Sequence, residues 1–124
     1  MAYETVWEDG GIYWKYSGLV NGEEILEAST KIYGDRRFDE IDYKLVDFNE
    51  VEDISISIEQ VSLIAFQHKA AEQINPLVRT AIVISSNCDL AVKFAAFFKD
   101  SKWQVELFET IDQANKFLGR IESI

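Results

Sequence analysis

Cysteine, proline and histidine are almost absent from this sequence, since each occurs once in 124 residues. The one cysteine, Cys88, cannot form a disulfide within the chain, which suits a reducing compartment. One histidine and one cysteine are also too few for a structural zinc site. The acidic residues Glu50, Glu52 and Asp53 lack the spacing of a calcium-binding loop. We therefore expect neither a metal nor a cofactor.

Long apolar runs are absent as well. None of the apolar segments approaches the roughly 20 residues that a transmembrane helix needs. The first residues, Met1–Glu4, lack the basic region and the apolar segment of a signal peptide. We therefore expect a cytoplasmic protein that does not cross a membrane.

Basic residues are scarce, with 12 Lys and Arg against 22 Asp and Glu and a net charge of −10. Nucleic acids and anionic membrane surfaces are bound by clustered basic side chains, so neither is an expected partner. Hydrophobic residues make up 48% of the chain, which is enough for a buried core. Because a chain of this length fits one compact unit, we expect a single domain spanning residues 1–124.

Two residue patterns alternate along the chain. Runs of β-branched and aromatic residues predict five strands. These are Thr5–Glu8 and Ile12–Tyr16, which form a hairpin around Gly10-Gly11, followed by Tyr43–Phe48, Arg79–Ile84 and Trp103–Phe108. Apolar residues at helical spacing predict four helices, which begin at the capping residues Asn21, Ser57 and Thr110 and at Leu90.

The order of these elements predicts the fold class. Strands that are joined through helices become parallel neighbours, whereas a hairpin adds an antiparallel strand. We therefore expect a small α/β domain with a mixed five-stranded sheet, an N-terminal β-hairpin and four helices. Tyr43–Phe48 is then a central strand, and an acidic loop joins it to the helix that begins at Ser57.

This order resembles the STAS domains, which include the anti-sigma-factor antagonists of the SpoIIAA type and, more closely, the uncharacterised bacterial SpoIIAA-like proteins. The resemblance implies a SpoIIAA-like (STAS-like) fold and a role in binding a protein partner. The pieces that carry it are Trp7, Gly10, Trp14 and Gly18 of the hairpin, Tyr43–Phe48, Asn75-Pro76 before Arg79–Ile84, and Val105–Phe108 with Thr110–Leu118.

In the antagonists that the chain resembles, an aspartate-serine pair opens the helix after the central strand, and phosphorylation of the serine switches partner binding. The matching stretch here is Asp53-Ile54-Ser55-Ile56-Ser57, which lacks that pair. We interpret Ser57 as a helix cap, with phosphorylation of Ser55 or Ser57 as the alternative.

Two side chains are candidates for enzyme chemistry. Cys88 follows a strand at the start of a predicted helix, where the pKa of a thiol can fall, but Asp89 is adjacent. His68 lies on the inner stripe of a predicted helix, with Glu72 one turn away. A lone histidine or cysteine is more often a packed residue, so we expect no enzyme activity.

The sequence therefore favours a non-enzymatic binding or regulatory module with a protein partner, and a homodimer is a second form of association. Its expected surface is the crest where the central strands end. The residues of this crest are Asp47, Asn49, Ser55, Ser57, Ser86, Asn87 and Cys88. The alternative is a small enzyme or small-molecule binder that uses Cys88 or His68 in a pocket at the carboxyl ends of the strands.

Overall fold

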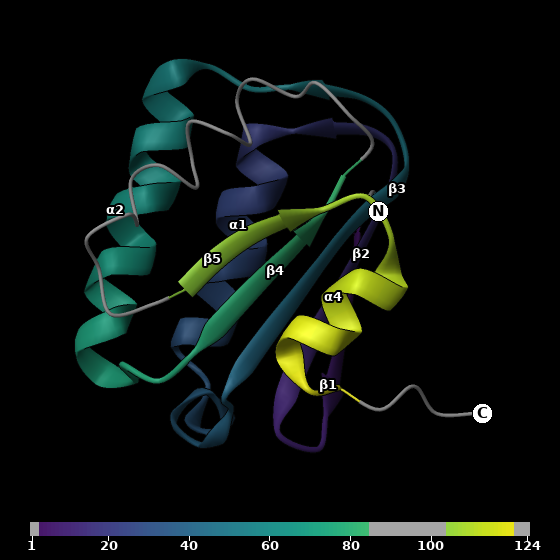
Figure 1. Cartoon of the computed structure of the whole chain (residues 1–124). Coiled ribbons are helices and arrows are strands. Elements are labelled where there is room, and N and C mark those ends of the chain that lie inside the picture. Colours follow the sequence, from purple (N-terminus) through teal and green to yellow (C-terminus); the bar gives the residue numbers. More distant parts are fainter. Residues whose placement is uncertain (1–2, 85–103, 121–124) are drawn as a thin grey trace.

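The computed structural model describes residues 3–84 and 104–120, and these residues form one five-stranded sheet in the order β1-β2-β3-β4-β5 (Figure 1). The first two strands pair antiparallel, and every later pair is parallel. The predicted mixed sheet with an N-terminal hairpin is therefore confirmed. The strands are β1 (Tyr3–Glu8), β2 (Gly11–Asn21), β3 (Tyr43–Ser55), β4 (Arg79–Val83) and β5 (Gln104–Phe108).

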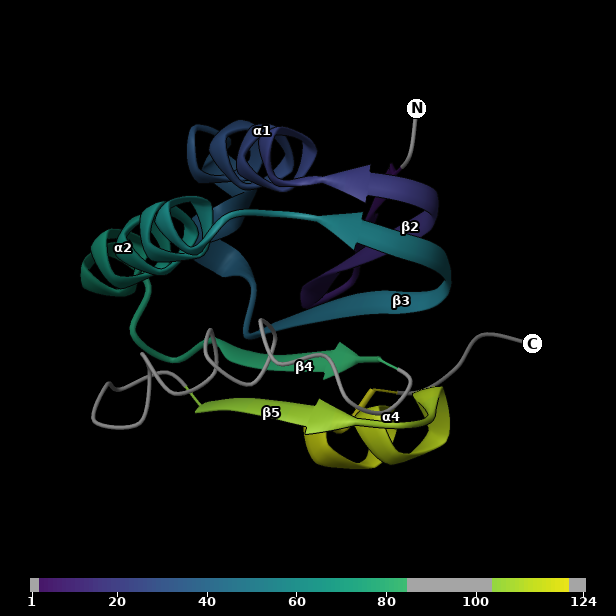
Figure 2. The same cartoon turned by 90° about the horizontal axis from the view of Figure 1, so that it is seen from above.

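Helices cover both faces of the sheet. Figure 2 shows α1 (Gly22–Tyr33) and α2 (Ile58–Ile74) on one side and α4 (Ile111–Leu118) on the other. The described residues thus contain three α-helices rather than the predicted four, and the helix expected from Leu90 lies outside the described residues. A short 3-10 helix, η1 (Arg36–Glu40), occupies the segment between α1 and β3.

The core is divided by the sheet into two parts. Ile12, Trp14 and Tyr16 alternate along β2 and pack on the side of α1 and α2. On the other side, buried small and apolar residues of β3 and β4 contact Ala114 and Leu118 of α4. This alternation is the period of two that places successive side chains on opposite faces of a strand.

The helices begin where local capping chemistry predicts. Asn21 exchanges hydrogen bonds with Glu24 at the start of α1, and Ser57 does the same with Gln60 at the start of α2. At α4 the predicted reciprocal cap is only half formed. The Thr110 side chain accepts from the backbone N–H of Gln113, but the Gln113 side chain accepts from the Glu109 N–H instead of the Thr110 N–H.

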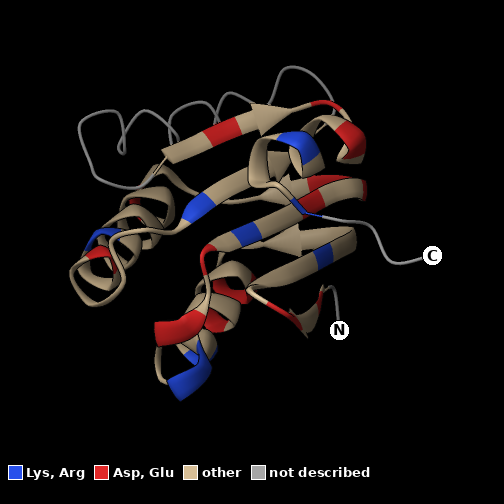
Figure 3. Cartoon of the chain, turned by 60° about the horizontal axis from the view of Figure 1, so that its bottom comes forward, with Lys and Arg blue, Asp and Glu red and all other residues tan. Residues whose placement is uncertain are grey.

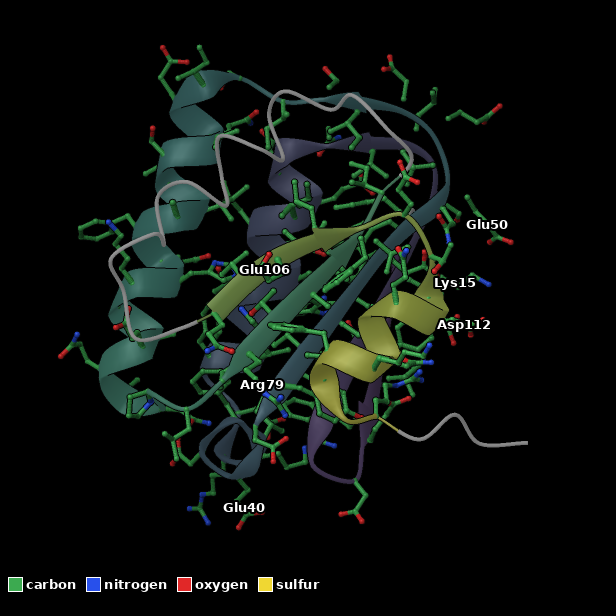
Figure 4. The ribbon with its side chains drawn as sticks, in the orientation of Figure 1. Lys15, Glu40, Glu50, Arg79, Glu106 and Asp112 are labelled. Atoms are coloured by element: carbon green, nitrogen blue, oxygen red, sulfur yellow. The ribbon has the colours of Figure 1, made fainter. Side chains whose placement is uncertain are left out.

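Arg79 fixes the end of α4 to the sheet. Its guanidinium donates hydrogen bonds of 2.8 Å to the carbonyl oxygens of Phe117 and Leu118. Arg79 lies beside α4 in Figure 4. These are carbonyls of the last turn, which have no partners within the helix. A positive charge at this end also complements the helix dipole.

The central strand is longer than predicted. We expected β3 to end at Phe48 and an acidic loop to follow, but β3 continues to Ser55. The extension depends on a distant segment, because β2 also continues to Asn21. It pairs with β3 from Ser17↔Glu50 to Asn21↔Ser55, with one register shift before Ser17 and one between Gly18 and Leu19. The predicted loop is therefore wrong, and only Ile56 and Ser57 separate β3 from α2.

Candidate functional site

Four of the seven residues of the predicted crest lie in the described part of the chain. Asp47, Asn49 and Ser55 lie on β3, and Ser57 is the N-cap of α2. Asn49, Ser55 and Ser57 are exposed, whereas Asp47 is buried. The other three predicted residues, Ser86, Asn87 and Cys88, lie outside the described residues.

Asp47 has a structural environment. Its carboxylate accepts hydrogen bonds of 2.9 Å from the Tyr13 hydroxyl and from the Asn49 backbone N–H. Burial, followed by the bond to Asp47, raises the pKa of Tyr13 to about 12. The carboxylate of Asp47 is therefore satisfied by Tyr13 of β2 and by the backbone of β3, and the bond to Tyr13 links the two strands.

Ser57 stands beside the beginning of the neighbouring helix. Its hydroxyl accepts the Gln60 N–H at 3.1 Å, and its own N–H donates to the Gln60 side chain at 3.0 Å. The Gln60 side chain lies directly over Gly22, where an added Cβ would stand 2.3 Å from the Gln60 Oε1. Glycine at position 22 thus allows the N-terminal ends of α1 and α2 to approach closely.

The outer side of α2 exposes large apolar side chains among the polar residues Ser62, Lys69 and Gln73. We use the name outer face for the side of the helix that carries Leu63, Phe66 and Ile74. Ile58 in the first turn and Leu77 after the helix are exposed as well. Phe66 is 73% exposed and Leu63 is 56% exposed. Leu63, Phe66 and Ile74 lie on one side of the helix because they are three and eight residues apart. A helix that is apolar on both sides is normally covered on both sides.

The residues of α2 also carry little charge. Its Lys, Arg, Asp and Glu residues are Glu59, Lys69 and Glu72, of which Glu72 is buried. Our sequence reasoning missed this outer face because it followed only the inner stripe that contains Val61, Ile64 and His68. The signal was present in the low amphipathicity of the segment, in which apolar residues occur on every side.

A group of buried polar residues lies beneath α2. The Lys44 amine of β3 donates a hydrogen bond of 2.9 Å to the Tyr33 hydroxyl. The His68 ring packs edge-on against Tyr33, and its Nδ1 lies 2.8 Å from the Ile64 carbonyl oxygen. Burial lowers the pKa of Lys44, while burial and then the Lys44 charge lower the pKa of His68. The structure therefore places His68 in the core.

A cavity of about 70 Å³ lies between α1, α2 and the sheet, and its lining is mostly apolar. Trp14, Val46, Thr80, Ile25, Ile64 and His68 are among its lining residues. Within the described residues, this cavity is the place to consider for the small-molecule binder that the sequence analysis gave as an alternative. Metal ligands are not gathered in this part of the chain, since residues 3–84 and 104–120 contain no group of three His, Cys, Asp or Glu that could hold an ion.

None of the described helices is both long and apolar enough to cross a lipid bilayer. Figure 3 shows that the Lys and Arg residues of the described chain are scattered over several elements rather than gathered in one patch.

Known structures share this arrangement. The chain is similar to the unphosphorylated form of SpoIIAA, an anti-sigma-factor antagonist, with a TM-score of 0.62 and 12% identity over 97% of this chain and 100% of that one. The chain has a SpoIIAA-like fold. The phosphorylated form of SpoIIAA from Bacillus gives a TM-score of 0.60 and 12% identity, with 94% of this chain and 98% of that one covered.

A third structure with a SpoIIAA-like fold is an uncharacterised protein of the DUF3478 family from Shewanella loihica PV-4. It gives a TM-score of 0.55 and 16% identity, with 94% of this chain and 92% of that one covered. No protein-family model matches the sequence, and no curated protein matches it. At these identities the comparisons establish the SpoIIAA-like fold, and the function has to be argued from the residues.

Proposed function

We propose that this protein is a non-enzymatic regulatory module that binds another protein through the outer face of α2. The observation that carries this proposal is the exposure of Leu63, Phe66 and Ile74 on one side of a helix that already buries its opposite side. Monomeric soluble proteins rarely expose contiguous apolar patches without a use for them. The SpoIIAA-like fold supports the general class of partner-binding module.

The chemistry of the outer face matches the centre of a protein interface. Interface centres are depleted in charge and enriched in aromatic residues, and a central aromatic side chain often contributes most of the binding energy. Phe66 lies between Leu63 and Ile74 along the helix and is an exposed aromatic anchor of this kind. Burying a large apolar side chain contributes about 1.5–3 kcal/mol before the cost of association is subtracted.

Acidic side chains outnumber the one exposed lysine of α2, Lys69, near this face, which supports a partner with a basic edge. Glu52 and Asp53 are exposed at the end of β3, and Glu59 is exposed in the first turn of α2. The whole chain carries a net charge of −10. A partner with an apolar patch bordered by Lys and Arg complements this surface, whereas a second copy of the chain repels it. We therefore propose a basic-rimmed protein as the partner, and a homodimer is the alternative outcome of the test.

In this proposal, Ser55 and Ser57 of the predicted crest are not the main contacts with the partner. Ser55 and Ser57 are exposed at the N-terminal end of α2, next to the outer face. We propose that Ser57 serves as the cap that fixes the first turn of α2, because both reciprocal bonds of the cap are formed. A phosphate on Ser57 would take the hydroxyl out of this cap and add charge beside Glu59.

The test uses the intact chain as bait in a lysate of its native host. Wild type, Phe66→Asp and Leu19→Asp are compared, since Leu19 on β2 is also 73% exposed and receives the same charge change. We expect one protein to be captured by wild type and by Leu19→Asp but not by Phe66→Asp. That protein is then identified by mass spectrometry and purified, and its affinity is measured against the three baits.

Support for the proposal requires that the purified protein binds directly and that its contact surface is basic at its edge. Equal capture by the Phe66→Asp and wild-type baits would place the binding surface elsewhere. Sedimentation analysis of the wild-type bait alone measures whether the chain associates with itself. Self-association through α2 would mean that the partner is a second copy of the chain.

A further inference from the structure

Thr80 presents a buried hydroxyl that has no hydrogen-bond partner. The residue lies on β4, is 1% exposed, and its Oγ1 bonds to no other described group. Leaving a buried hydroxyl unpaired costs about 1–3 kcal/mol, which is why nearly all buried polar atoms in proteins are paired. This unpaired hydroxyl therefore requires an explanation from its surroundings.

The surroundings of Thr80 are the apolar cavity beneath α2. The cavity is about 70 Å³ in volume, and Thr80 is one of the few polar residues that line it. Most of the wall is aliphatic or aromatic, with Val46 and Ile82 on the sheet and Ile25 and Ile64 on the helices. The space is about half of the roughly 150 Å³ engineered cavity that binds benzene, so it suits a molecule of about three non-hydrogen atoms.

The polarity of the lining selects the class of ligand. A charged group is strongly disfavoured, because an ion that leaves water for an apolar wall loses its hydration. A fully apolar molecule would fill the space but leave the Thr80 hydroxyl unpaired. A water molecule needs two to four polar partners, and besides Thr80 the lining offers few, such as Ser29 and His68, so water can fill the polar part of the cavity but leaves the apolar part empty. The best fit is a neutral molecule with an apolar body and one oxygen.

We propose that the cavity between the sheet and the inner face of α2 binds a short-chain aliphatic alcohol or carbonyl compound, whose single oxygen pairs with the hydroxyl of Thr80. The apolar body of this ligand contacts the aliphatic wall. The site uses the inner face of α2 and is therefore independent of the protein-binding role proposed for its outer face.

The test is a titration of the wild-type protein with ethanol, followed by the methyl signals of Val46, Ile64 and Ile82 in NMR spectra. We expect saturable shifts that are confined to methyl groups of the cavity wall, with cross-peaks between these methyls and the ligand. Two variants separate the hydroxyl from the shape of the side chain. Thr80→Val removes the hydroxyl and should weaken binding about fivefold to tenfold, whereas Thr80→Ser keeps the hydroxyl and should bind nearly as wild type.

Several results would overturn the proposal. One is a wild-type protein that shows no saturable shift, and another is a Thr80→Val variant that binds ethanol as tightly as wild type. Cross-peaks from Thr80 to a long-lived water that ethanol does not displace would show that the cavity holds water alone. If both variants lose their dispersed spectra and fail to fold, the wild-type titration with its cross-peaks decides the question by itself.

Discussion

The amine of Lys44 donates a hydrogen bond to the hydroxyl of Tyr33 at 2.9 Å, although the Lys44 side chain is completely buried. Lysine is among the residues that are almost never fully buried without a partner. The pair therefore places the titratable amine of Lys44 in the core beneath α2. The pH dependence of the free energy of unfolding should reflect the burial of this amine.

The buried amine should make the protein more stable as pH rises from 7 to 9. Burial lowers the pKa of Lys44 in the folded state, so below the ordinary lysine pKa the unfolded chain binds more protons than the folded chain, and stability increases with pH. One such proton corresponds to at most about 1.4 kcal/mol per pH unit. Urea denaturation at pH 7 and pH 9 measures this slope. In Lys44→Met the slope should disappear, and an unchanged slope would show that other groups cause it.

The same reasoning applies to His68 at lower pH. Burial and the Lys44 charge lower the pKa of His68 in the folded state, so as pH falls the His68 ring takes up a proton more readily in the unfolded state than in the folded state. Stability should therefore fall as pH decreases below about 6.5, the ordinary pKa of histidine. Thermal denaturation between pH 7 and pH 5 tests this fall. Replacement of His68 by Leu should flatten the curve, and a steep curve in this variant would contradict the assignment.

Arg120 and Glu8 form a paired contact that links the segment after α4 to the hairpin. Two guanidinium nitrogens of Arg120 lie 2.8 Å from the two carboxylate oxygens of Glu8, and both side chains are largely buried. We expect Arg120→Lys to lower the free energy of unfolding by about 1–2 kcal/mol, because lysine cannot donate both bonds.

The matched control for Arg120 is the exposed pair of Lys15 and Glu50. Their charged atoms are 3.3 Å apart, and their side chains lie together in Figure 4. Exposed pairs contribute about 0–1 kcal/mol, so Lys15→Met should change stability by much less than Arg120→Lys does. Equal losses in the two variants, measured by chemical denaturation, would refute a special contribution from the Arg120 contact.

Ser57 should behave as a helix cap in stability measurements. Ser57→Ala removes the acceptor of the Gln60 N–H and should cost about 1 kcal/mol. Ser55 is also exposed but is not a cap, so Ser55→Ala should change stability by less than about 0.5 kcal/mol. Circular dichroism during denaturation compares the two. A Ser57→Ala variant as stable as wild type would mean that the cap contributes nothing.

The features that sequence could predict are those that depend on nearby residues. Asn21 with Glu24 and Ser57 with Gln60 located the helix starts because each cap is formed within four residues. The continuous apolar run at Arg79–Ile84 located β4 because a central strand buries both of its faces.

The features that sequence could not predict depend on contacts between distant segments. The extension of β3 to Ser55 requires pairing with Ser17–Asn21, which no local pattern in the acidic segment indicates. The burial of Lys44 requires Tyr33 and His68 to converge from two helices. The outer face of α2 is a different case, because its apolar residues are visible in the sequence and were overlooked once the inner stripe had been assigned.

The most direct measurement for the proposed function is calorimetric titration of the purified partner into wild type, Phe66→Asp and Leu19→Asp. We predict that Phe66→Asp weakens binding by about 2 kcal/mol or more, roughly thirtyfold in Kd, while Leu19→Asp binds within about threefold of wild type. The stability of Phe66→Asp should stay within about 0.5 kcal/mol of wild type, because the side chain is 73% exposed. A Kd for Phe66→Asp equal to that of wild type would contradict the central claim that the outer face of α2 binds the partner.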